Sequence, residues 1–218
     1  MFECFKETYK KPETKMTQVV DKFSTKIAVI VGHNAKSQGA TNYLKESEYV
    51  FNSRIALKMQ EKCALLGIEL VILKRPSGLS YKDQCRAVAK QVKALSISYT
   101  IELHFNAASS KALGCEVLVD ATHSNYDDKI ADYITDQLNE LYGFKERHED
   151  GVKTVTPEHD GHGMLEAVKN AGAVSVLVEP CFAHYRNAES ALIFEQEDKY
   201  VDVLVGTCLQ ICKGLIFK

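Results

Sequence analysis

The chain has 218 residues, of which 45% are hydrophobic and 26% are charged, and these fractions are ordinary for a globular protein with one buried core. The formal net charge of -2 gives no basic field for binding nucleic acid. No apolar run approaches the roughly 18 residues of a membrane span, so we expect no membrane-spanning segment.

The seven cysteines are odd in number, scattered and without a C-x-x-C pair, which predicts reduced thiols and synthesis in a reducing compartment. Residues 1–25 are polar and lysine-rich, with room for a short helix over 16–23. They contain no apolar core of signal-peptide length. We therefore expect an N-terminal extension over 1–25, a main domain over 26–218 and a cytoplasmic location.

The first predicted strand, 27–31, has five apolar residues that are mostly β-branched, as in a strand buried on both faces of a parallel sheet. Over 44–66 apolar residues recur at three- and four-residue spacing, which predicts an amphipathic helix that stops at Gly67. The next predicted elements are a strand over 68–73, a helix over 81–95 and a strand over 97–105.

The second half of the chain continues the alternation of strands and helices, and no internal repeat is visible. This pattern predicts an α/β fold with a mainly parallel sheet and helices on both faces. The predicted elements are a strand over 114–119, a helix over 125–142, an irregular surface loop over 144–163, one or two helical turns over 164–170, a strand over 174–178 and helices over 188–194 and 200–215.

Three of the predicted strands end on residues that can carry chemistry: His33, His104 and Glu179. In open α/β sheets, ligands bind at the carboxyl ends of the strands. These three residues, although distant in sequence, are therefore expected to form one site.

Two imidazoles and one carboxylate make a common catalytic zinc set. His33 and His104 supply the imidazoles, and Glu48 or Glu46, early in the helix after His33, can supply the carboxylate. Glu179 ends an apolar strand, where a general-base role at a metal-bound water would explain a costly carboxylate. Each residue alone also has a simpler explanation, because strand-end histidines are often structural and glutamates often complement a helix dipole.

Four short motifs carry a family resemblance when they are taken together. They are G-H after the first strand, E-x-x-x-N over 48–52, H-x-N-A over 104–107 and L-V-E-x-x-F over 177–182. In this order, and over about 26–216, the sequence resembles the zinc-dependent N-acetylmuramoyl-L-alanine amidases of the type 3 branch.

The resemblance implies that His33, Glu48 and His104 bind zinc (Zn2+) and that Glu179 is the catalytic carboxylate. It selects Glu48 over Glu46, because only Glu48 stands four residues before Asn52. It also implies a phosphorylase/hydrolase-like fold, an amidase catalytic domain over 26–218, and hydrolysis of the amide between N-acetylmuramic acid and L-alanine in peptidoglycan.

Several positions depart from the motifs of this family. Asn34 and Ala35 follow the first histidine where glycines are usual, and Cys181 stands where a glycine is usual. Glu102 replaces the usual serine two residues before His104. Because alternate strand residues share a face, Glu102 is expected beside His104, where it either supports the site or adds an unwanted carboxylate.

The sequence shows no signal peptide and no wall-binding repeat, and in this it resembles phage endolysins. Such enzymes accumulate in the host cytoplasm and reach the cell wall when the membrane is breached. A bacterial enzyme of mother-cell lysis or wall turnover is the rival role. The alternative activities are a zinc peptidase acting on peptidoglycan cross-links, a non-enzymatic wall-binding relative, and a plain α/β scaffold. We expect a monomer.

Overall fold

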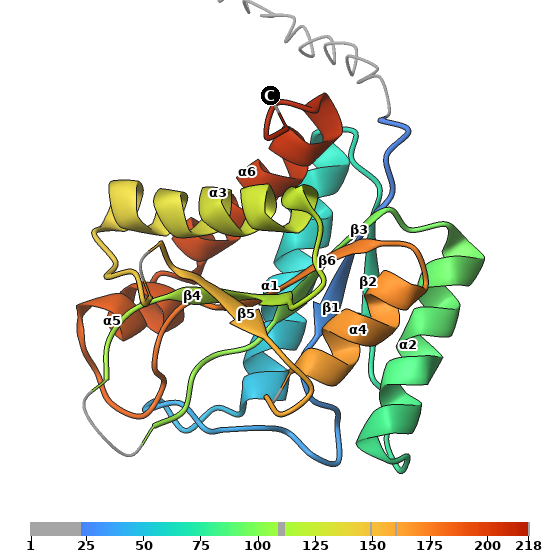
Figure 1. Ribbon diagram of the computed structural model, residues 1–218. Coiled ribbons are helices and arrows are strands. Elements are labelled where there is room, and N and C mark those ends of the chain that lie inside the picture. The colour runs from blue at the N-terminus through green and yellow to red at the C-terminus, as the bar shows by residue number, and fades with distance from the viewer. Residues whose placement is uncertain (1–22, 109–111, 149, 160, 218) are drawn as a thin grey trace, which may run out of the picture.

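The computed structural model (Figure 1) describes residues 23–108, 112–148, 150–159 and 161–217. The predicted extension over 1–25, including the range 16–23 that has room for a short helix, lies almost entirely outside the described residues. Among the helices of the described part, none is long and apolar enough to cross a membrane.

Six strands form one sheet in the order β2-β1-β3-β6-β4-β5. The four strands β2, β1, β3 and β6 run parallel, whereas β4 pairs antiparallel with β6 and β5 runs parallel to β4. The predicted α/β fold with a mainly parallel sheet is confirmed. The strands are β1 (Ile27–Val31), β2 (Leu70–Lys74), β3 (Tyr99–Leu103), β4 (Glu116–Asp120), β5 (Val152–Val155) and β6 (Val174–Glu179).

Helices cover both faces of the sheet (Figure 1). Alternate residues of β1 point to opposite faces: Ile27, Val29 and Val31 pack in the core beneath α1, α3, α5 and α6, while Ala28 and Ile30 pack with α2 and α4. The helices are α1 (Glu48–Leu65), α2 (Tyr81–Leu95), α3 (Asn125–Tyr142), α4 (His162–Asn170), α5 (Ala188–Glu195) and α6 (Glu197–Lys213).

Strand β5 lies inside the stretch 144–163, which the sequence predicts as an irregular loop, so that prediction is wrong in part. The strand has only four residues, and its pairing partner β4 is far away in sequence. Only Val155 among its residues is buried. A strand this short at the sheet edge gives too weak an alternation of apolar and polar residues to be recognised from the sequence.

Helix α1 begins at Glu48, four residues after the start that its apolar spacing predicts. The Ser47 hydroxyl accepts a hydrogen bond from the Val50 amide and so caps the helix. Leu44, which extended the apolar pattern, is half exposed instead. The cap places Glu48 in the first helical turn, directly above the carboxyl edge of the sheet.

One backbone carbonyl joins three elements below this edge. The Leu103 oxygen, at the end of β3, accepts hydrogen bonds from the Gly32 amide after β1, at 3.1 Å, and from Nδ2 of Asn52 on α1, at 3.0 Å. Asn52 is completely buried. It therefore fixes the start of α1 against the ends of β1 and β3.

Replacing Asn52 by alanine is expected to lower the free energy of unfolding by about 1 to 3 kcal/mol, because a buried hydrogen bond is lost. The measurement is urea denaturation. Ser53→Ala is a matched control on the same helix, because the Ser53 hydroxyl has no hydrogen-bond partner among the described residues. Equal stability of the two variants would contradict the role given to Asn52.

Candidate functional site

The strand pairing aligns the ends of β1, β3 and β6. Val31 pairs with Leu103, and Leu103 pairs with Val178, so these three residues form one row across the sheet. His33, His104 and Glu179 follow this row by one or two residues. The predicted convergence of distant residues at one sheet edge is therefore what the structure contains.

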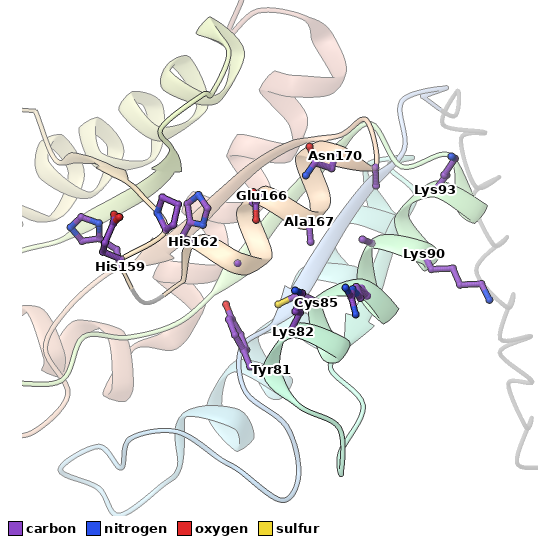
Figure 2. A pocket seen from close by; sticks show the side chains of 16 residues that line it. Tyr81, Lys82, Cys85, Lys90, Lys93, His159, His162, Glu166, Ala167 and Asn170 are labelled. Atoms are coloured by element: carbon purple, nitrogen blue, oxygen red, sulfur yellow. The ribbon is translucent and has the colours of Figure 1, made fainter.

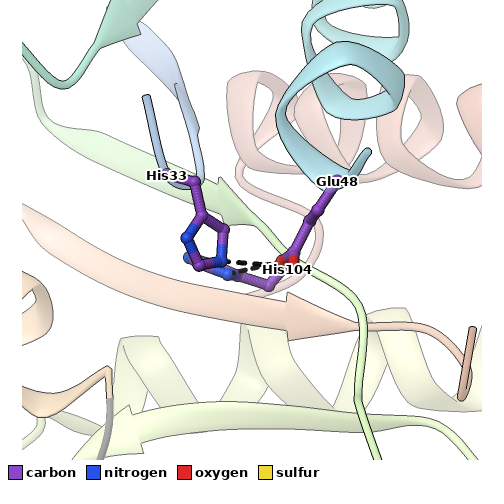
Figure 3. A group of neighbouring side chains, drawn as sticks. All are labelled: His33, Glu48 and His104. Atoms are coloured by element: carbon purple, nitrogen blue, oxygen red, sulfur yellow. Dashed lines mark hydrogen bonds and ion pairs between the residues drawn. The ribbon is translucent and has the colours of Figure 1, made fainter. Parts of the chain in front are cut away.

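His33, Glu48 and His104 point toward one another (Figure 3), and each offers a ligand atom within 4.8 Å of the other two. Glu48 Oε2 lies 3.2 Å from His33 Nε2, and Glu48 Oε1 lies 2.8 Å from His104 Nδ1. Glu46, the alternative that spacing alone left open, instead pairs with Arg54. Two imidazole nitrogens and a carboxylate facing one another match the donor set of a catalytic zinc ion.

The backbone conformations of Gly39 and His33 let the loop after β1 pass close to these side chains. Gly39 has a φ of +76°, and a Cβ there would lie 2.5 Å from His33 Cδ2 and 2.6 Å from Glu48 Oε2. His33 itself has a φ of 62°, in the left-handed region that a non-glycine residue adopts at a cost of about 1 kcal/mol or more. From this backbone conformation the His33 ring faces Glu48.

The Glu48 carboxylate is held by backbone amides as well as by the imidazoles. The amide of Ala40 donates to Oε2 at 3.2 Å, and the amide of Phe105 donates to Oε1 at 3.1 Å. Burial raises the pKa of Glu48, but the hydrogen bonds from His104 and His33 outweigh burial and lower it to about 2. Glu48 is therefore ionised at neutral pH, as a metal ligand must be.

His104 lies between two carboxylates. Its Nδ1 faces Glu48, and its Nε2 lies 3.2 Å from Oε1 of Glu102. Burial lowers the pKa of His104, but the hydrogen bonds to Glu102 and Glu48 outweigh burial and raise it to about 9. Metal binding through His104 must therefore displace a proton, which makes the affinity of the site pH-dependent.

Glu179 lines the same cleft, which has a volume of about 530 Å³. Burial raises the pKa of Glu179 to about 7, with cationic His104 opposing this shift and Glu116 reinforcing it. A carboxylate that titrates near neutral pH is suited to take and return a proton. Glu179 is thus placed and tuned differently from Glu48.

Two residues of the cleft were missed by the sequence analysis. Arg75 follows β2 directly and forms an ion pair with Glu102, and Tyr81 begins α2, with its ring 5.2 Å from the Arg75 guanidinium carbon. The strand-end rule that identified His33 applies equally to Arg75, since β2 is parallel to β1. The strand predicted from the sequence ends at residue 73, whereas β2 extends to Lys74, so Arg75 was not recognised as a strand-end residue.

Two departures from the family motifs have different outcomes. Cys181 is fully buried and packs in the hydrophobic core, outside the group of possible metal ligands. Glu102 is also fully buried, but it contacts His104 and Arg75. Of the two substitutions, only Glu102 touches a candidate ligand.

A larger cavity, of about 850 Å³, lies between α2 and α4 (Figure 2). Lys82 and Lys90 line it from α2, and Glu166 lines it from α4. None of His33, Glu48 and His104 reaches it, so the chemistry of the donor set, not the size of the cavity, identifies the candidate site. Tyr81 lines both cavities.

The raised pKa of Glu179 makes the stability of the metal-free protein depend on pH. Between pH 4.5, the ordinary pKa of a glutamate, and about pH 7, Glu179 keeps a proton in the folded protein that it has lost in the unfolded chain. The free energy of unfolding therefore falls as the pH rises through this window. Glu179→Gln has no such charge to bury. The free energy of unfolding of the variant minus that of wild type is therefore expected to be larger at about pH 8 than at about pH 5, by on the order of 2 kcal/mol.

The measurement is urea denaturation of chelator-treated protein at both pH values. Glu140→Gln, the same chemical change at an exposed position of α3, serves as the control. A constant difference between Glu179→Gln and wild type across the two pH values would contradict the raised pKa.

The chain was compared with known proteins. None of the curated proteins matches this sequence. Among solved structures, the catalytic domain of the N-acetylmuramoyl-L-alanine amidase CwlV from Bacillus (Paenibacillus) polymyxa var. colistinus superposes with a TM-score of 0.65 at 20% identity, covering 89% of this chain and 99% of that one.

Two further structures share the fold. An N-acetylmuramyl-L-alanine amidase from Mycobacterium smegmatis gives a TM-score of 0.70 at 16% identity, covering 89% of this chain and 99% of that one. The catalytic domain of the CD27L endolysin, which targets Clostridia difficile, gives 0.63 at 21% identity, covering 85% and 95%. At these identities the likeness establishes the fold.

The family model described as Amidase_3, N-acetylmuramoyl-L-alanine amidase, matches residues 27–203. The match spans every strand of the sheet and all of His33, Glu48, His104 and Glu179. The chain therefore belongs to the Amidase_3 family of N-acetylmuramoyl-L-alanine amidases.

Proposed function

We propose that this protein is a zinc metallohydrolase that cleaves the amide bond between N-acetylmuramic acid and the L-alanine of the peptidoglycan stem peptide. The observation that carries the proposal is the convergence of His33, Glu48 and His104 beside Glu179 in one cleft. This donor set has the composition of catalytic zinc sites that keep one coordination position free for water or substrate. Family membership supports the amide as the bond that is cleaved.

His33, Glu48 and His104 would hold the zinc ion. When bound, zinc supplies a Lewis acid for the carbonyl and lowers the pKa of a water molecule to about 7. The protein contributes ligands that are already oriented, since the amides of Ala40 and Phe105 fix the Glu48 carboxylate before any metal arrives. This preorganisation lowers the entropy cost of assembling the site.

Glu179 would act as the general base and then as the general acid. Its carboxylate takes a proton from the attacking water and returns it to the nitrogen of the departing L-alanine. In the metal-free protein, burial raises the pKa of Glu179 to about 7, so this carboxylate binds a proton more readily than an exposed glutamate does. Burial of Glu179 and, to a lesser degree, the neighbouring Glu116 both favour the protonated carboxyl.

The first experiment is incubation of the purified protein with peptidoglycan, with and without a chelator, followed by mass spectrometry of the released fragments. We expect free stem peptides that begin with an unblocked L-alanine, lost on chelation and restored by zinc. Cut cross-links on stems that remain attached to sugar would identify a peptidase instead. No release from a zinc-loaded protein would point to a wall-binding relative.

Glu179→Gln is expected to retain zinc but to lose hydrolysis by about 100-fold or more, because proton transfer is removed while the ligands stay in place. His104→Ala is expected to lose both zinc and hydrolysis. Metal content and amide hydrolysis are measured on the same preparations, with Glu140→Gln as the surface control. Full activity of Glu179→Gln would show that another group is the base.

We also propose a lytic, endolysin-like role, with synthesis in the cytoplasm and action on the wall after the membrane is breached. The described cysteines support a reducing compartment: they are free thiols, and all except Cys212 are buried. The likeness to the CD27L endolysin domain is compatible with this role. Rapid loss of turbidity from membrane-permeabilised cells, but not from intact cells, is the expected result; slow wall turnover without lysis would favour the rival role.

A further inference from the structure

Glu102 is a charged residue that lies inside the sheet. It lies on β3, a central strand of the sheet, and is completely buried. Oε1 of Glu102 contacts both Arg75 Nη2 and His104 Nε2, whereas Oε2 has no hydrogen-bond partner in the described part of the chain. A buried carboxylate of this kind costs several kcal/mol of desolvation, so its contacts call for an explanation.

Arg75 reaches Glu102 across a neighbouring strand. Arg75 follows β2, Glu102 lies on β3, and β1 runs between them. Gly32, just after β1, leaves space for the His104 ring, because a Cβ there would lie 2.7 Å from the Cε1 and Nε2 atoms of His104. The pair is therefore built by three strands, and it lies against the Nε2 edge of the His104 ring.

The two nitrogens of His104 face different partners. Nδ1 is 2.8 Å from Glu48 Oε1, on the side of the candidate ligands, while Nε2 is directed to Glu102. An imidazole that binds a metal through one nitrogen keeps its proton on the other. A carboxylate that accepts this second N–H fixes the tautomer and the orientation of the ring.

Arg75 completes the arrangement. Its guanidinium only donates hydrogen bonds, so Nη2, which lies 3.3 Å from Nε2, cannot bond to that nitrogen while the nitrogen carries a proton. It donates to Glu102 Oε1 instead. The positive charge of Arg75 offsets the carboxylate charge, and Glu102 lies outside the group of candidate ligands found among the described residues.

We propose that the Glu102 and Arg75 pair is a positioning device that holds His104 with Nε2 protonated and Nδ1 free for the metal. The inference rests on the proposed zinc site. It assigns a supporting role to Glu102, one of the residues at which this chain departs from the motifs of its family. Neither residue touches the substrate in this proposal, since both act through His104.

The test is the zinc affinity of the purified full-length protein, measured by competition with a chromogenic chelator. Glu102→Gln keeps an acceptor for Nε2–H but removes its charge, and we expect about tenfold weaker binding. The double variant Arg75→Met with Glu102→Leu removes the acceptor and both charges together, and we expect about 100-fold weaker binding. The double variant also guards against misfolding, because apolar replacement of a buried ion pair is often neutral for stability.

Thr100→Val is the matched control. Thr100 lies two residues earlier on the same face of β3 and is buried, and its hydroxyl donates to the Ser175 hydroxyl at 2.8 Å, its one side-chain hydrogen bond among the described residues. Its loss is expected to lower stability while leaving zinc affinity within about threefold of wild type. The visible spectrum of the cobalt-substituted protein provides a second readout, which should change in Glu102→Gln and not in Thr100→Val.

Unchanged zinc affinity in both Glu102 variants would overturn the inference, as would an equal loss in Thr100→Val. These results do not depend on hydrolysis. If wild type binds zinc and the variants rank as expected, but no stem peptide is released, the proposed amidase activity fails and the positioning role stands. A wild-type protein that binds no zinc overturns both.

Discussion

The Glu48 carboxylate is the contact on which the site depends. It lies in the first turn of α1, receives hydrogen bonds from the backbone amides of Ala40 and Phe105, and faces the imidazoles of His33 and His104. The loop after β1, the end of β3 and the start of α1 therefore meet at one charged group. Backbone amides therefore hold both carboxylate oxygens of Glu48.

Three carboxylates lie around His104, and their surroundings shift their pKa values in different directions. Glu48 and Glu102 both have a pKa lowered to about 2, because hydrogen bonds and cationic neighbours outweigh the effect of burial. For Glu179 burial prevails instead, and its pKa rises to about 7. The same side chain is thus a permanent anion at two positions, whereas at the third its pKa lies near neutral pH.

The sequence predicts the secondary structure best where local signals agree. The bounds of α2 and α3 match the predicted ranges because serine caps and clear amphipathic patterns mark them. Strand β5 was missed because a short edge strand is specified by its distant partner β4. The strand-end histidines were identified because a parallel sheet brings such ends together regardless of their separation in sequence.

Other features of the site depend on contacts between distant elements, which spacing alone does not reveal. Spacing left Glu46 and Glu48 equivalent, and the family motif was needed to choose between them. The structure supplies the physical reason, since Ser47 caps α1 and directs Glu48 over the sheet, while Glu46 pairs with Arg54. Arg75 is a similar case, because its importance depends on a partner two strands away.

The ion pair between Arg75 and Glu102 is difficult to explain by stability alone. Its two side chains are almost fully buried, and Arg75 Nε and Glu102 Oε2 have no hydrogen-bond partners among the described residues. A pair with such incomplete contacts recovers little more than its cost of desolvation, and a well-packed apolar pair would stabilise the sheet as well or better. Functional sites commonly retain groups that folding would not favour. The pair lies against Nε2 of His104, the ring nitrogen that does not face Glu48, and this position accounts for the pair as a support for the orientation of the ring.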